Sequence, residues 1–455
     1  MNYSPREGKR QAKINDEAHR MERAAKALDY YNYEQDSYLA DAIKARYSTE
    51  HEDILRYRFT APVTESLINQ LAVTFKEEPT ITIDGSDAQK EAFGKLLDAS
   101  DAMRKLAMAD RYAELMHKVG LIPIWTGRRV SLQLLTPDKT IVKTDKYGDV
   151  EELRYWIGEA KENIHQVEAF RVWAVWTELE YYEVETNANG EDIKVIPGSQ
   201  EVNPYGRIPV AWFSTDEVLG SFWADKGYPI IELNENINMK VTNLDIGMDY
   251  QSFSTMVTIG MKDEESLPVG VTRRINIPRA DGGGMADGDV KYITPDAKLE
   301  AVWKIIQEQI QWFGSLMGIN VEAIGGQRQY NSGFQLKLAK QGVIDRNNSK
   351  KAFYMQPTRD IIQLLMECAS HYGNEHYPDN PNITIIFAEI QVESDPLQDR
   401  QVDTIDIANG VDDAFTIIKR RYPDMSDEDI KEHLDGIAER KKQAGGYEPE
   451  DIEEL

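Results

Sequence analysis

Apolar residues recur at intervals of three and four along several long stretches of the chain, and this spacing predicts α-helices. The clearest stretch is 224–253, whose apolar positions would all fall on one helical face. These positions are Ile230, Leu233, Ile237, Val241, Leu244 and Met248. The same pattern predicts helices over residues 5–48, 62–77, 88–119, 296–317 and 333–371. A kink is expected near Pro357 in the last of these, because proline removes a backbone donor and clashes with the preceding turn.

Between residues 121 and 212 the helical pattern gives way to short runs of β-branched and aromatic residues. Turn sequences such as KYGD and NANGED separate the runs, which therefore predict a mostly antiparallel meander. Strands and helices do not alternate, so a doubly wound nucleotide-binding fold is not expected, and the pattern indicates an α+β class. The strand tryptophans are expected to pack in a core rather than to form a ligand cage. They are Trp156, Trp173, Trp176 and Trp212.

The chain of 455 residues is strongly acidic, with a net charge of −26. Apolar residues make up 41% and charged residues 29%, which indicates a folded soluble protein. Proteins that bind nucleic acid tightly usually carry the opposite charge. Cys368 is the one cysteine, which excludes an intramolecular disulfide and a cysteine-based metal cluster and favours an intracellular setting. Neither a membrane span nor a signal peptide is expected.

Charge is distributed unevenly along the chain. Residues 319–351 carry six basic and two acidic residues, a net charge of +4, whereas residues 423–455 carry four basic and twelve acidic residues, a net charge of −8. The basic stretch includes the glycine-punctuated sequence GINVEAIGGQRQYNSG, which separates two predicted helices. The asymmetry is a stronger indication of function than the total charge, because it places cations at one loop and the helix that follows. The acidic C-terminal stretch is expected to be a solvated extension.

Motifs of the common enzyme classes are missing from the sequence. It contains no Walker-type phosphate loop, no GxGxxG after a strand, no GxSxG and no HExxH. His371 and His376 could form a zinc pair, although a solvated helix end fits their spacing better. Asp281, Asp287 and Asp289 lack the spacing and the bidentate glutamate of an EF-hand, so a flexible turn is favoured over a calcium site. We therefore expect no enzymatic activity, no cofactor and no metal.

Several motifs occur in a characteristic order along the chain. They are FTAPVTESLINQLAVTFKEEPTITID, NPYGRIPVAWF, GSFWADKGYPIIELNENIN and MGINVEAIGGQRQYNSGFQLKLA. In this order, over roughly residues 55–420, the sequence resembles the portal (connector) proteins of tailed bacteriophages. It departs from the family pattern at Asn320, where the family often has proline, and at Gln335, where a small residue is common.

The resemblance implies a ring of twelve subunits, or of thirteen in isolation, at one vertex of the virion capsid. Such a ring forms a channel through which double-stranded DNA is packaged and ejected without sequence preference. The implied partners are the terminase large subunit, head-completion or adaptor proteins, and the major capsid and scaffolding proteins. The protein would be made in the cytoplasm of the host bacterium.

The resemblance also implies a portal-type α+β fold with a mixed α/β wing, long paired stem helices, a small α/β clip, a long kinked helix and a helical crown. The corresponding residues are an N-terminal helical arm (1–48), wing (49–222), stem helices (223–253 and 296–318), clip (254–295), tunnel loop (319–332), kinked helix with a wing strand (333–395), crown (396–442) and disordered acidic tail (443–455).

The same resemblance assigns candidate site residues to three groups. DNA-facing candidates are Gln327, Arg328, Gln329, Tyr330, Asn331, Lys337 and Lys340. Loop hinges are Gly325, Gly326 and Gly333, because glycine accepts backbone angles that are closed to other residues. Candidates for docking the packaging motor in the clip are Arg273, Arg274 and Arg279.

Each assignment has an alternative. Arg328 could pair with Glu322 or with a carboxylate of a neighbouring subunit. Lys337 and Lys340 could lie on an ordinary solvated helix face. The clip arginines could line the DNA exit, or neither dock the motor nor line the exit. For the whole chain, the alternatives are an enzyme and another oligomeric virion protein, such as a minor head or baseplate component without a DNA channel.

Overall fold

The computed structural model describes most of the chain, and the chain divides into two compact units. The first unit comprises residues 1–326 and 342–390, and the second comprises residues 327–341 and 391–455. The described residues are 5–47, 51–160, 170–187, 192–215, 222–223, 227–252, 255–259, 274–277, 289–293, 299–319, 333–373, 375–378, 381–389, 404, 407, 413–421 and 426–443.

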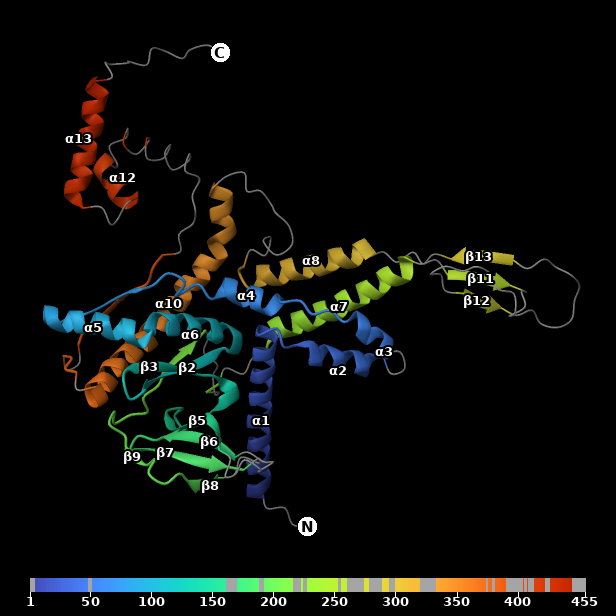
Figure 1. The fold of residues 1–455 in the computed structure, drawn as a ribbon, viewed down its shortest axis with the longest axis horizontal. Coiled ribbons are helices and arrows are strands. Elements are labelled where there is room, and N and C mark those ends of the chain that lie inside the picture. The colour runs from blue at the N-terminus through green and yellow to red at the C-terminus, as the bar shows by residue number, and fades with distance from the viewer. Residues whose placement is uncertain are drawn as a thin grey trace, which may run out of the picture. The chain divides into compact units, whose positions relative to one another are not determined.

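The first unit contains helices and sheets, which confirms the α+β class (Figure 1). Its helices are α1 (Pro5–Tyr31), α2 (Asp36–Arg46), α3 (His51–Ile54), η1 (Leu55–Tyr57), α4 (Val63–Leu71), α5 (Asp87–Ser100), α6 (Ala102–Met116), η2 (Pro137–Lys139), α7 (Pro229–Ser252) and α8 (Leu299–Leu316). The second unit contains α12 (Ala414–Arg421) and α13 (Asp427–Gln443), and α10 (Gly333–Gly373) has residues in both units.

Two helices predicted as continuous are each divided in the structure. The stretch 5–48 breaks between α1 and α2, where Tyr33 has a φ angle of 65°. The stretch 88–119 breaks at Asp101, whose φ angle of 58° ends α5 in the left-handed conformation. The helix predicted over 62–77 ends early, at Leu71, because the backbone amide of Thr74 donates to a side chain of α6 instead of to a helical carbonyl.

The predicted antiparallel meander is confirmed. Its order is β4-β5-β6-β7-β8, with β9 paired to β7, and a second sheet has the order β10-β2-β3. The bounds are β2 (Lys118–Trp125), β3 (Val130–Leu135), β4 (Thr140–Thr144), β5 (Val150–Ala160), β6 (Phe170–Trp176), β7 (Glu180–Thr186), β8 (Asp192–Val195), β9 (Glu201–Val202) and β10 (Ala211–Ser214). Trp173 and Trp176 are buried and Trp156 and Trp212 pack partly buried against the same cores, as expected for core residues.

Two smaller sheets join segments that are distant in sequence. β1 (Thr80–Ile83) pairs antiparallel with β14 (Ile383–Ile386), about three hundred residues later. The remaining sheet joins β11 (Thr255–Ile259), β12 (Arg274–Ile277) and β13 (Asp289–Ile293), with β11 parallel to β12 and antiparallel to β13. These pairings depend on tertiary structure and have no signal in local periodicity.

The second half of α10 forms part of the main core of the first unit. Tyr354, Ile361, Ile362 and Leu365 have no exposed surface. The Tyr354 ring stacks on Phe75, with the ring centroids 5.9 Å apart, and meets the ring of Phe213 in β10 edge-on. The helix continues through Pro357. The kink at that residue stays a prediction.

A ladder of buried polar side chains joins α7 to the extended segment that precedes α4. Asn234, Asn238 and Thr242 lie four residues apart on α7 and are fully buried. Asn238 Oδ1 accepts from the backbone amide of Ala61 at 2.9 Å, and Asn238 Nδ2 donates to Gln35 Oε1 at 3.1 Å. Because a buried backbone group must be hydrogen-bonded, these side chains take the place of a partner strand.

Replacing Asn238 with alanine should lower the free energy of unfolding by about 2–4 kcal/mol, because buried donors and acceptors lose their partners. Asn236→Ala provides the control on the same helix, since Asn236 is exposed and bonds only within α7. That variant should change stability by less than about 0.5 kcal/mol. Urea unfolding followed by tryptophan fluorescence measures both. Equal losses in the two variants would contradict the role of the ladder.

Candidate functional site

Most candidate residues from the sequence lie outside the described part of the chain. Those outside are Gly325, Gly326, Gln327, Arg328, Gln329, Tyr330, Asn331, Arg273 and Arg279. Gly333 is the first residue of α10, and Lys337 and Lys340 follow it within the helix, while Arg274 is the first residue of β12. The side chains of these last three residues also fall outside the described part.

α7 and α8 run side by side in the first unit (Figure 1). The face of α8 that meets α7 and α4 is apolar, and Ile306 at its centre is 2% exposed. A flank of α8 outside this contact is apolar too: Ile305, Trp312 and Leu316 are 48%, 66% and 65% exposed, and they lie seven and four residues apart. We call these three residues the α8 stripe. Trp303 is exposed on the other flank.

A buried ionic cluster connects α10 to α6. The Lys350 ammonium lies 2.7 Å from Asp110 Oδ1 and 2.8 Å from Glu114 Oε1, and it donates to the carbonyl oxygen of Leu71 at 3.2 Å. Leu71 and Glu114 accept hydrogen bonds from this ammonium, whereas Asp110 Oδ1 meets it as an ion pair and is without a hydrogen-bond partner among the described residues. Lys350, Asp110 and Glu114 are all at least nine-tenths buried. A charge at such depth is tolerated only when it is paired and hydrogen-bonded.

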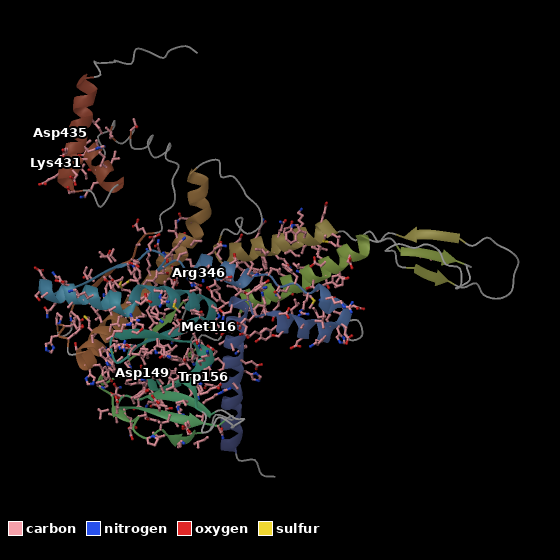
Figure 2. The ribbon with its side chains drawn as sticks, in the orientation of Figure 1. Met116, Asp149, Trp156, Arg346, Lys431 and Asp435 are labelled. Atoms are coloured by element: carbon pink, nitrogen blue, oxygen red, sulfur yellow. The ribbon has the colours of Figure 1, made fainter. Side chains whose placement is uncertain are left out.

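Further bonds extend the cluster to neighbouring segments. Arg346, which is labelled in Figure 2, places its Nη2 2.7 Å from Glu114 Oε2, so each oxygen of that carboxylate has its own cation. The other oxygen of Asp110 accepts from the backbone amide of Thr74 at 2.9 Å. Thr74 Oγ1 in turn donates to Asn347 Oδ1 at 2.8 Å. α6, α10 and the chain after α4 are therefore tied at one point.

Burial raises the pKa of the Asp110 carboxyl above its usual value, although the Lys350 ammonium beside it acts in the opposite direction. Because the pKa of Asp110 is higher in the folded protein, ionisation of this carboxyl costs free energy of folding. The lysine therefore compensates for a real cost at neutral pH. Removing it would leave two carboxylates buried beside each other.

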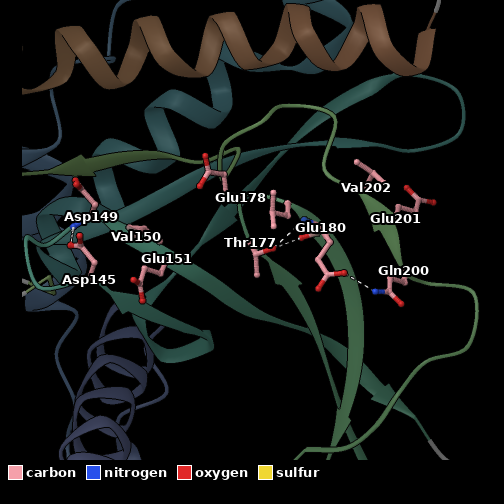
Figure 3. A pocket seen from close by; sticks show the side chains of 11 residues that line it. Asp145, Asp149, Val150, Glu151, Thr177, Glu178, Glu180, Gln200, Glu201 and Val202 are labelled. Atoms are coloured by element: carbon pink, nitrogen blue, oxygen red, sulfur yellow. Dashed lines mark hydrogen bonds between the residues drawn. The ribbon is translucent and has the colours of Figure 1, made fainter.

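A pocket of about 950 Å³ lies at the edge of the meander and is lined by carboxylates (Figure 3). Glu180 is held by Gln200, whose Nε2 donates to it at 2.6 Å. The acidic lining residues are Asp145, Asp149, Glu151, Glu178, Glu180 and Glu201, and no lysine or arginine lines the pocket. A surface with this much negative charge repels phosphate groups. The pocket therefore does not suit nucleic acid.

Neither a metal site nor a membrane span is found where the structure can be described. Within those residues, no group of three or more His, Cys, Asp or Glu side chains is placed to hold a metal ion. No described helix is long and apolar enough to cross a membrane.

A family model described as phage portal protein, SPP1 Gp6-like, matches residues 10–444. The chain belongs to this phage portal family. As a portal-type protein it is a structural protein of a virion. A search of curated proteins finds no significant match.

Two solved structures similar to this portal protein come from gene transfer agent (GTA) particles. One is the virion of a native particle, with a TM-score of 0.38, and the other is the neck of an empty particle with C6 symmetry, with a TM-score of 0.42. In both cases 10% of the aligned residues are identical, and the match covers 79% of this chain and 89% of the other.

The ionic cluster corrects the sequence-based picture of charge in this portal protein. Arg346 and Lys350 contribute to the net charge of +4 counted over residues 319–351, but both are engaged by carboxylates of α6. Lys351 donates to the carbonyl oxygen of Ala388 at 2.9 Å. The side chains of the other three cations in that stretch, Arg328, Lys337 and Lys340, lie outside the described part of the chain.

Lys350→Met should lower the free energy of unfolding by about 3–5 kcal/mol at pH 7, because it leaves Asp110 and Glu114 buried without their shared cation. The loss should shrink as the pH falls toward 5, since protonation neutralises the Asp110 carboxyl, whose pKa burial has raised. Lys351→Met is the adjacent control and should cost about 1 kcal/mol, with little pH dependence. Thermal unfolding across this pH range measures both, and a loss for Lys350→Met that grows at low pH would contradict the assignment.

Proposed function

We propose that this protein assembles into a ring-shaped channel at one vertex of the capsid, through which double-stranded DNA is packaged and ejected. The ring contains twelve copies, or thirteen in isolation. The terminase motor docks first, and head-completion or tail proteins replace it. Membership of the portal family supports this proposal, and the α8 stripe is the observation that carries it.

The α8 stripe supports assembly because its side chains are too large and too apolar to remain in water without cost. A buried tryptophan removes about 150–250 Å² from solvent, and exposed apolar patches of this kind mark interaction surfaces. Trp303 on the other flank of α8 provides a second apolar surface. A helix with apolar residues on both flanks fits a head-to-tail contact, in which each copy meets one neighbour with each side and the ring closes.

The charge distribution suits a channel that passes DNA of any sequence. A net charge of −26 on every copy discourages DNA from adhering to most surfaces. Arg328, Lys337 and Lys340 then provide the few phosphate contacts, which require no reading of bases and exchange readily. Gln327, Gln329, Tyr330 and Asn331 add neutral contacts, and Gly325, Gly326 and Gly333 serve as hinges.

The β11–β13 region forms the clip in this proposal. Arg273, Arg274 and Arg279 give it a positive surface, which fits an acidic face on the packaging motor. The major capsid and scaffolding proteins contact the ring around its wing. α7 and α8 form the stem, and residues 396–442 form the crown.

Trp312→Glu should prevent or weaken ring assembly, because a charge would be buried in each contact between copies. We expect the association to weaken by about 2–4 kcal/mol per interface. Light scattering after size exclusion gives the mass, and negative-stain images show whether a central hole is present. Gln311→Glu is the matched control, since it adds the same charge at a polar exposed position of α8 and should leave the ring intact. Wild-type rings from Trp312→Glu would rule out the stripe as the interface, and rings without a hole would favour another virion structural protein.

Arg328→Gln should lower the yield of DNA-filled particles by roughly two- to tenfold while leaving ring assembly unchanged, because every copy loses one phosphate-binding cation. Particles produced by complementation can be separated by density to count filled and empty heads. Lys95→Gln removes a cation from an exposed position of α5 and serves as the control. A yield equal to that of the wild type would remove Arg328 from the channel.

A further inference from the structure

The chain after α8 ends the helix with a glycine-dependent turn. Gly318 has a φ angle of 72°, its amide donates to Ser315, and the amide of Ile319 donates back to the carbonyl oxygen of Gly314 at 2.8 Å. This pair of bonds defines a Schellman motif, in which the residue after the helix adopts the left-handed conformation. The Ile319 side chain is 4% exposed, as is usual for the apolar residue that follows such a glycine.

The same glycine lies against α10. A Cβ atom built on Gly342 would be 2.7 Å from the carbonyl oxygen of Gly318 and 3.2 Å from its Cα. These are backbone atoms, so no side chain can move aside to make room. The two segments can approach this closely only because both residues are glycine. The end of α8 and residue 342 of α10 are therefore in direct backbone contact.

The ionic cluster fixes α10 immediately beyond this contact. Arg346 follows Gly342 by one helical turn, and its Nη1 lies 3.5 Å from the carbonyl oxygen of Met317 at the end of α8. Its other terminal nitrogen binds Glu114, and Lys350 follows one turn later with its ion pairs to Asp110 and Glu114. The glycine contact and the salt bridges thus act on the same side of α10, and both connect it to the core of the first unit.

We propose that Gly318, Gly342, Arg346 and Lys350 form an anchor that holds both ends of the intervening segment at one point of the subunit. The anchor makes Gly342 and Arg346 positioning residues for the proposed DNA-facing residues, which lie in the segment between Gly318 and Gly342. This inference therefore rests on the proposed function. A load applied to the segment is passed to α6 and the core instead of separating α8 from α10. The folded subunit already holds the two ends of this segment together. DNA binding therefore does not have to offset the entropy cost of closing the loop.

Gly342→Ala tests the anchor directly, because alanine would otherwise stabilise a helix interior. Amide hydrogen exchange on the purified full-length protein should be faster by about tenfold or more at Gly318, Ile319 and residues 343–346, since overpacking forces the segments apart. Gly94→Ala is the matched control: Gly94 lies inside α5 with open space around its Cβ position, so exchange there should stay the same or slow. Arg346→Gln, which removes the guanidinium and its charge, should speed exchange at the same amides.

The same variants are then scored for DNA-filled particles. Faster exchange with fewer filled particles supports the proposal. Exchange like that of the wild type in both Gly342→Ala and Arg346→Gln overturns it. Faster exchange with a normal yield of filled particles overturns the positioning role of Gly342 and Arg346. If Arg328→Gln also gives a normal yield, the proposed DNA-facing role of the segment is wrong as well.

Discussion

The arrangement of the first unit depends on one buried ammonium group. The Lys350 ammonium forms ion pairs with Asp110 and Glu114 on α6, and it donates hydrogen bonds to Glu114 and to the last carbonyl of α4. Each acceptor alone would be a costly group to bury, and so would the lysine. Together they are satisfied only in one relative placement of the three segments. A cluster of this kind adds little net stability compared with apolar packing, but it penalises every alternative arrangement.

The cluster also determines which cations are left for the surface. Two of the positive charges in the basic stretch 319–351 are used inside the fold. Under the proposed function, the phosphate contacts of this stretch fall to Arg328, Lys337 and Lys340. Internal structure and external charge are therefore not independent, because a basic residue that secures the helix cannot also contact phosphate.

The sequence predicted those features that arise from local pattern. The antiparallel meander follows from alternating short strands, and the span of α10 follows from apolar spacing. The breaks at Tyr33 and Asp101 escaped prediction because both are left-handed residues other than glycine, which carry no compositional signal. The pairing of β1 with β14 escaped because strand partners are chosen by the tertiary fold.

The ionic cluster shows where a signal was present but ambiguous. Arg346 and Lys350 are four residues apart, as are Asp110 and Glu114, so each pair occupies one helix face. One such pair is indistinguishable from a solvated face, and Arg346 and Lys350 entered the sequence-based picture only as part of the net charge of residues 319–351. Two pairs of opposite sign, each beside apolar residues that mark a buried face, would have been the informative combination. Gly342, one turn before Arg346, completes that pattern, because a glycine inside a helix lowers its stability unless another backbone needs the space.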